Sequence, residues 1–151
     1  MRTDTTTPDT RLADDPLKFN PASVDSQIDL ATGGLPTRHH GKLLFSRLRY
    51  LDPVRRRAGL PEGVAALVER MTGDETRVTL VNTNAVDART VLVQGGAYAE
   101  HQIVSANLDG KKLAVAGAQV AVRLQPGCGG ALVLKMDRFT RTPTLAFPWG
   151  E

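Results

Sequence analysis

The chain lacks several features on which a membrane or disulfide-bonded protein depends. Its 151 residues contain one cysteine, Cys128, which excludes an intramolecular disulfide. No uninterrupted apolar run reaches about 18 residues, and the first residues lack the apolar stretch of a secretory signal. We therefore expect a cytoplasmic protein without a membrane partner.

Sequence patterns for common chemistry are also absent. No GxGxxG or GxxxxGK[ST] motif follows a predicted strand, so neither a dinucleotide nor a nucleoside triphosphate site is indicated. His39 and His40 are adjacent and would point apart on a regular element, and further ligands at metal-site spacing are lacking. No nucleophile or acid-base pair can be assembled, since Cys128 has no activating neighbour in the sequence. We expect no catalytic residue, cofactor or metal, and hence no enzyme.

The net positive charge of the chain comes from one segment. Residues 38–57 carry seven basic side chains against Asp52 alone, whereas residues 1–37 are acidic and residues 58–151 are neutral. Only Phe45 and Tyr50 interleave with these charges, which is little for a nucleic-acid interface. We expect arginines that cap carbonyls or pair with carboxylates, and no nucleic-acid partner.

The N-terminal half predicts little regular structure. Residues 1–16 are rich in Thr, Asp and Pro and predict a flexible leader. Residues 17–75 predict an irregular connector, with a possible short helix over Ser23–Leu30 and an imperfectly alternating strand over Leu43–Leu51. One short helix is expected over residues 61–72, where Pro61 suits the first turn and apolar side chains recur at helical spacing, namely Val64, Leu67, Val68 and Met71.

From Thr76 onward the apolar period changes to two. Strands are expected near residues 76–83, 88–95, 100–108, 111–116, 119–125 and 130–138, with turn residues between them. Asp109-Gly110 predicts a type I′ turn. Short strands with no helices between them predict an all-β fold, an antiparallel β-sandwich of about six to eight strands over residues 76–151.

The alternation also predicts which side chains fill the sandwich. The expected inward set is Val78, Leu80, Val91, Val93, Val120, Val122, Leu124, Leu132, Leu134 and Met136. An outward apolar set remains, comprising Val81, Leu92, Ile103 or Val104, and Val133. Only about 64 residues carry the regular pattern, and so small a core is marginal. We expect either residues 43–71 or another polypeptide to pack against it.

Three side chains are the candidate binding residues. Tyr98 and His101 stand with Glu100 at the start of a predicted strand, the only place where an acid, a base and an aromatic ring gather. Trp149 belongs to the C-terminal segment RTPTLAFPWGE, where two prolines favour an extended strap that closes the core or docks a partner.

The order of segments resembles a known architecture. RVTLVNTN, RTVLVQGG with GAYAEH, the LDGKKLAV hairpin and VAVRLQPGCGGALVLKM resemble the C-terminal β-sandwich domains that follow an α/α-barrel in bacterial glycoside-hydrolase-like proteins, including linalool dehydratase/isomerase-like proteins. The resemblance implies a truncated or separately encoded accessory domain whose catalytic barrel lies outside this chain. No catalytic residue can be carried over.

Two functions follow as expectations. The first is a non-catalytic accessory module that packs against a larger, barrel-like catalytic domain or another copy of itself. The second is a stand-alone module that binds carbohydrate or another polar ligand through Tyr98, His101 or Trp149.

Overall fold

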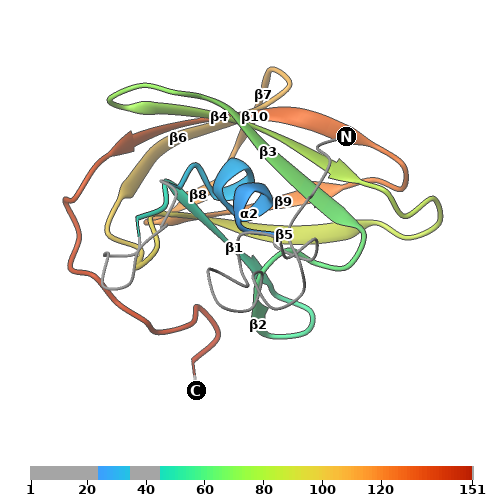
Figure 1. The fold of residues 1–151 in the computed structure, drawn as a ribbon, viewed down its shortest axis with the longest axis horizontal. Helices are drawn as coiled ribbons and strands as arrows, with labels where there is room; N and C mark the ends of the chain where they lie inside the picture. The colour runs from blue at the N-terminus through green and yellow to red at the C-terminus, as the bar shows by residue number, and fades with distance from the viewer. Residues whose placement is uncertain (1–23, 35–44, 151) are drawn as a thin grey trace, which may run out of the picture.

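The computed structural model describes residues 24–34 and 45–150 and shows two antiparallel β-sheets packed against each other, with one helix at their open side (Figure 1). The antiparallel β-sandwich predicted from the sequence is confirmed. The leader predicted over residues 1–16 lies outside the described residues. No helix in the described part of the chain is long and apolar enough to cross a membrane.

Each sheet has five strands. Sheet A has the order β2-β1-β5-β9-β8, with β1 at Leu48–Asp52, β2 at Arg57–Ala58, β5 at Arg89–Gly95, β8 at Val115–Ala116 and β9 at Gln119–Leu124. Sheet B has the order β3-β4-β10-β6-β7, with β3 at Val64–Met71, β4 at Glu75–Asn82, β6 at Gln102–Leu108, β7 at Lys111–Leu113 and β10 at Gly129–Asp137. The strand expected near 111–116 is therefore divided between the two sheets at Ala114.

The core follows the predicted alternation. All ten side chains of the expected inward set are buried, and residues from both sheets form one apolar cluster. Ile103 also points inward and is 1% exposed, whereas Val104 is 57% exposed, so Val104 is the outward member of that pair. The Asp109-Gly110 turn has positive φ at both residues, 47° and 87°, as a type I′ turn requires.

The helix predicted over residues 61–72 is wrong. These residues form the edge strand β3, in which Val64, Ala66 and Val68 face the core and pair with β4. The spacing of the apolar residues fits both a helix and a strand, because Ala65 and Ala66 are compatible with either period. If these residues were helical, the backbone groups along one edge of β4 would have no partner, and β3 supplies that partner. Gly63, at φ 75°, adopts a left-handed conformation that has no place in a first helical turn.

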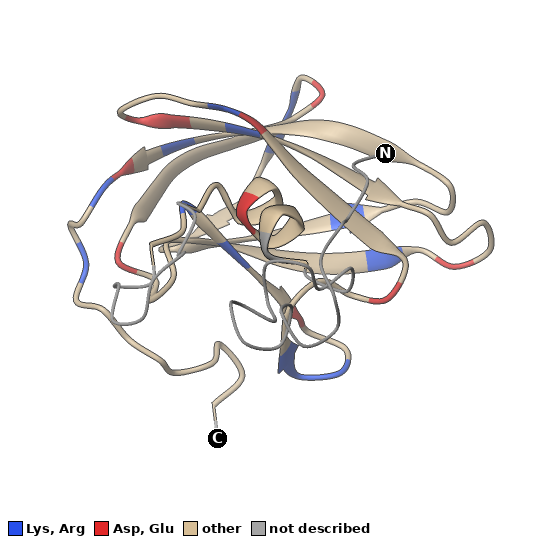
Figure 2. Ribbon diagram, viewed as in Figure 1, with Lys and Arg blue, Asp and Glu red and all other residues tan. Residues whose placement is uncertain are grey.

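Strands β1 to β3 lie inside the segment expected to be an irregular connector. They complete both sheets, so the sandwich begins well before Thr76. The basic segment between β1 and β2 stands out in Figure 2, and two of its three arginines are paired within the domain: Arg55 with Glu62, and Arg57 with Asp52.

Helix α2, Asp25–Thr32, occupies the possible short helix noted near residue 23. Ser23, the first residue of the predicted helix, lies outside the described residues. The larger apolar side chains of this segment do not form its packing side, since Val24, Ile28 and Leu30 are about half exposed. Instead the helix contacts β3 and β1, and Ala31 packs on the core cluster.

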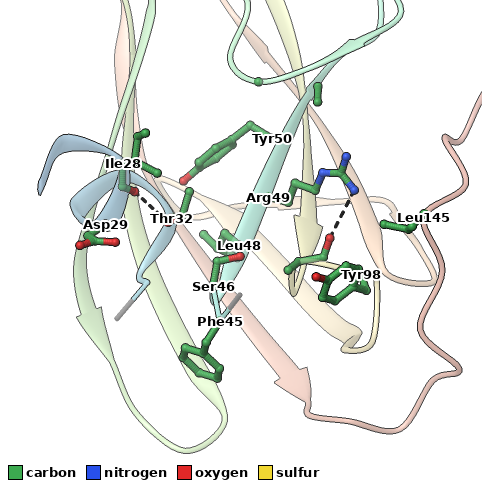
Figure 3. A pocket seen from close by; sticks show the side chains of 13 residues that line it. Ile28, Asp29, Thr32, Phe45, Ser46, Leu48, Arg49, Tyr50, Tyr98 and Leu145 are labelled. Atoms are coloured by element: carbon green, nitrogen blue, oxygen red, sulfur yellow. Dashed lines mark hydrogen bonds between the residues drawn. The ribbon is translucent and has the colours of Figure 1, made fainter. Parts of the chain in front are cut away.

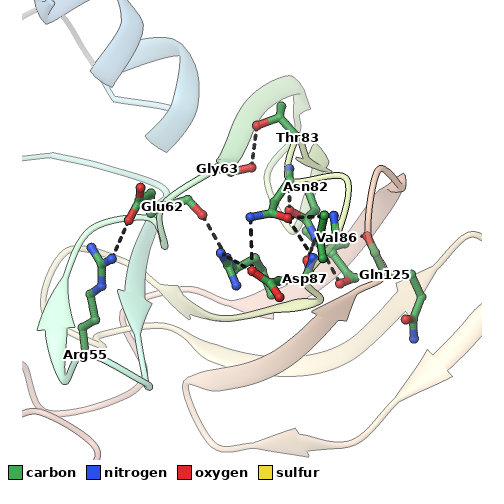
Figure 4. Close-up of polar contacts among 11 residues, drawn as sticks. Arg55, Glu62, Gly63, Asn82, Thr83, Val86, Asp87 and Gln125 are labelled. Atoms are coloured by element: carbon green, nitrogen blue, oxygen red, sulfur yellow. Dashed lines mark hydrogen bonds and ion pairs between the residues drawn. The ribbon is translucent and has the colours of Figure 1, made fainter.

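A polar network closes the end of the sandwich where β4 stops (Figure 4). Asn82 is fully buried, and its Nδ2 donates to the carbonyl oxygens of Asp87 at 2.8 Å and Gln125 at 3.1 Å. Its Oδ1 accepts from the amide of Asn84 at 3.1 Å. One side chain therefore holds the β4–β5 loop to the segment that follows β9.

Candidate functional site

A pocket of about 520 Å3 opens beside α2 (Figure 3). It lies between the helix, β1 and the loop that follows β5. Its lining is largely apolar, with a few polar groups: Ile28, Asp29, Thr32, Phe45, Ser46, Leu48, Arg49, Tyr50, Ala58, Gly59, Ala97, Tyr98 and Leu145. Volume and lining fit the usual size and character of a small-molecule site, roughly 300–1,000 Å3.

The helix wall of the pocket is fixed by the way α2 ends. Gly33 follows the helix at φ 63°, and a Cβ there would lie 2.7 Å from Met71 Sδ and 3.0 Å from Arg47 Cβ. The hydroxyl of Tyr50 donates to the carbonyl oxygen of Ala31 at 2.6 Å. Burial raises the pKa of Tyr50, so its phenol stays protonated and remains a donor. The helix terminus is thus held against β1 and β3.

The opposite wall carries Arg49, the one basic side chain among the described residues of the lining. Arg49 Nη1 donates to the carbonyl oxygen of Ala97 at 3.3 Å, which orients the guanidinium toward the loop after β5. Its Cζ also lies 5.5 Å from the centre of the Phe147 ring. A guanidinium held in this way can receive an acceptor group of a ligand while the aromatic side chains contact the ligand's apolar face.

The C-terminal strap adds aromatic surface next to this wall. The amide of Thr144 donates to the carbonyl oxygen of Tyr98 at 2.8 Å, which fixes the strap to the loop. Phe147 and Trp149 are stacked, with centroids 5.1 Å apart and planes 11° from parallel. Leu145 is 71% exposed, so the strap does not close the core.

The structure separates the three predicted binding residues. Tyr98 lines the pocket. Trp149 does not line it but stacks on Phe147, whose ring in turn lies over the guanidinium of the lining residue Arg49. His101 is fully buried and does not line the pocket, because its ring packs edge-on against Phe139 at 4.7 Å. The assignment of Tyr98 and Trp149 to binding stays a prediction.

His101 has a well-defined environment in the core. Its Nδ1 accepts a hydrogen bond from the amide of Phe139 at 3.2 Å, which leaves the proton of the neutral ring on Nε2. Burial lowers the pKa of His101; Glu100 opposes this effect, and the charges of Arg138 and Arg47 reinforce it. The imidazole is therefore neutral in the folded chain near neutral pH.

The remaining sequence candidates are Cys128 and the two adjacent histidines. Cys128 is exposed in the turn before β10. Among the residues that the structure describes, no three His, Cys, Asp or Glu side chains are grouped to hold a metal ion. His39 and His40 lie outside those residues.

Sequence reasoning missed most of the pocket. Residues of α2 supply one wall, and Phe45, Arg49 and Tyr50 supply another. A signal was present, since Phe45 and Tyr50 are the aromatic residues that interleave with the basic segment. Placing them beside α2 and Tyr98 requires the tertiary fold.

Comparison of the chain with protein-family models, with curated proteins and with solved structures found no match. The resemblance to the C-terminal domains of α/α-barrel proteins therefore stays a prediction. The site must be interpreted from its own geometry.

Proposed function

We propose that this chain is a non-catalytic β-sandwich module that binds a polar ligand with an apolar face, the class to which carbohydrates belong. The pocket beside α2 carries the proposal, because it combines an apolar lining with Arg49 and the exposed part of Tyr98. The stacked Phe147 and Trp149 extend this surface. Aromatic side chains suit the apolar face of a sugar, and Arg49 suits its oxygens or a carboxylate.

Glycan-array screening of the purified chain tests this proposal, with acidic sugars included to probe Arg49. We expect a bound ligand whose signal falls at least about tenfold in Tyr98→Ala, the loss that removing one ring contact of roughly 1.5 kcal/mol would cause. Trp149→Ala should weaken binding as well. Val104→Ala is the matched control, because Val104 is exposed on β6 and does not line the pocket. The absence of any ligand, or equal binding by all three variants, would contradict the proposal.

A second proposal is an accessory module that packs against a larger, barrel-like domain or against a second copy. It is supported by the exposed apolar side chains of the C-terminal strap and the turn before it, with Phe139 61%, Leu145 71% and Phe147 37% exposed. The small-core argument for such a partner no longer applies, because residues 48–71 complete both sheets.

Light scattering and binding of an apolar dye test this second proposal. We expect self-association or strong dye fluorescence that falls in Leu145→Ser. A tight monomer with a cooperative thermal transition and no dye binding would exclude it.

A further inference from the structure

Four buried side-chain atoms lack a hydrogen-bond partner in the described residues. They are Arg47 Nε, Thr76 Oγ1, His101 Nε2 and Arg138 Nε. Buried polar atoms are nearly always paired, so a group of unpaired ones requires an explanation.

The strand register brings these atoms to one end of the sandwich, opposite the Asn82 network. In sheet B, Met136 pairs with Ile103 and Asp137 with Gln102. The next positions are Arg138 and His101. The rings confirm this neighbourhood, since Phe139 contacts both the imidazole at 4.7 Å and the Arg138 guanidinium at 5.0 Å.

Arg47 reaches the same end from sheet A. Its Nη2 donates to the carbonyl oxygen of Thr72 at 2.8 Å, and its Nη1 to that of Gly73 at 3.4 Å. The adjacent carbonyl oxygen, that of Asp74, accepts from the amide of Met136 at 2.7 Å, so this turn lies beside the end of β10. Arg47 is 6% exposed, and its Nε is buried without a partner.

The three unpaired nitrogens are all hydrogen-bond donors. Both arginine Nε atoms carry a hydrogen, and the neutral imidazole carries its proton on Nε2, because Nδ1 accepts from Phe139. These three donors, on two cations and one ring, therefore lie at the same end of the sandwich. Burial, and then the charge of Arg138, lowers the pKa of Arg47, as expected of two cations that lie near each other.

No described carboxylate takes up these donors. Glu100, next to His101, uses its Oε2 to accept from the amide of Tyr98 at 2.7 Å, and Asp137, next to Arg138, is exposed. The ion pairs of the described residues involve neither Arg47 nor Arg138.

We propose that Arg47, His101 and Arg138 form a binding site for a small free oxyanion, of the size and charge of phosphate or sulfate. Such an anion offers several acceptor oxygens to the three donors and compensates the two positive charges. Arg138 is half-buried and gives the anion its route from solvent, whereas Arg47 and His101 form the enclosed part. This site is independent of the pocket beside α2.

The test is a titration of the 15N-labelled full chain with inorganic phosphate, followed by NMR at constant pH and ionic strength. We expect a saturable shift of the His101 imidazole signals, which report the Nε2 position directly. Sodium chloride at the same ionic strength should not produce it. A water molecule as the occupant would leave the signals unchanged in phosphate, and that result would overturn the proposal.

The variant Arg138→Gln provides the second measurement. It should weaken the apparent phosphate affinity at least about tenfold, the loss of one charge-assisted hydrogen bond. Arg123→Gln on β9 is the matched control, because Arg123 is exposed and lies outside the cluster. Equal affinity in both variants would overturn the proposal, and the titration of the unsubstituted chain decides the matter if Arg138→Gln does not fold.

Discussion

Replacing Asn82 by Asp tests whether one buried amide holds the end of the sandwich together. The substitution keeps the size of the side chain but removes the donor that serves Asp87 and Gln125 and turns a negative charge toward their carbonyl oxygens. Two lost hydrogen bonds cost about 1 kcal/mol each, and leaving buried carbonyl groups unpaired adds to this cost. We expect a loss of about 2–4 kcal/mol of unfolding free energy at neutral pH, or roughly 4–16 °C in melting temperature for a domain of this size.

Circular dichroism during urea and thermal unfolding measures this loss. Asn107→Asp is the matched control, because Asn107 uses only its Oδ1, which accepts from the amide of Gly110 at 2.7 Å, and a carboxylate preserves that bond. Lowering the pH protonates the introduced carboxyl group and restores one donor, so the deficit of Asn82→Asp should shrink in acid while that of Asn82→Ala persists. A cost for Asn82→Asp no larger than that of Asn107→Asp would refute the reasoning.

Three further predictions concern the core and α2. Because burial lowers the pKa of His101, the folded chain binds this proton less readily than the unfolded chain. Stability should therefore be full above about pH 6.5 and decline as the pH falls below it, with a flatter urea-unfolding profile in His101→Gln; equal profiles would contradict this. Tyr50→Phe removes the bond to Ala31 and should cost about 1–2 kcal/mol, with faster amide exchange in α2; unchanged exchange there would show that the bond does not hold the helix. Gly33→Ala should destabilise the chain more than Gly127→Ala in thermal unfolding, because both have φ near 63° but a Cβ at Gly127 would meet nothing within 4 Å; equal costs would show that crowding at Gly33 is unimportant.

The sequence was sufficient for the part of the fold in which alternation is strong. From Glu75 to Asp137 most inward positions carry a large aliphatic side chain, so period and burial agree. The segment Val64–Met71 was misassigned because its small alanines fit two periods. Only the free edge of β4, which is a tertiary feature, decides between helix and strand.

Less of the candidate sites than of the fold could be predicted from the sequence. Tyr98 was identified from its local surroundings, and it does line the pocket. His101 was identified by the same reasoning, yet it is buried against Phe139. Both residues lie in the loop between β5 and β6, where side chains close in sequence point in different directions, so closeness in sequence does not place them in one site. Arg47 and Arg138 are 91 positions apart in the sequence, and only the tertiary fold brings them to the same end of the sandwich.

The position of β10 has a consequence for how the chain folds. This strand is the middle one of sheet B, where it pairs with both β4 and β6. β4 and β6 do not pair with each other, so until residue 137 has been synthesised both have an open side, and sheet B exists only as two separate hairpins. Such long-range pairing makes folding slow. During synthesis the edges of β4 and β6 that pair with β10 stay unpaired until the end, and aggregation competes with folding in that interval.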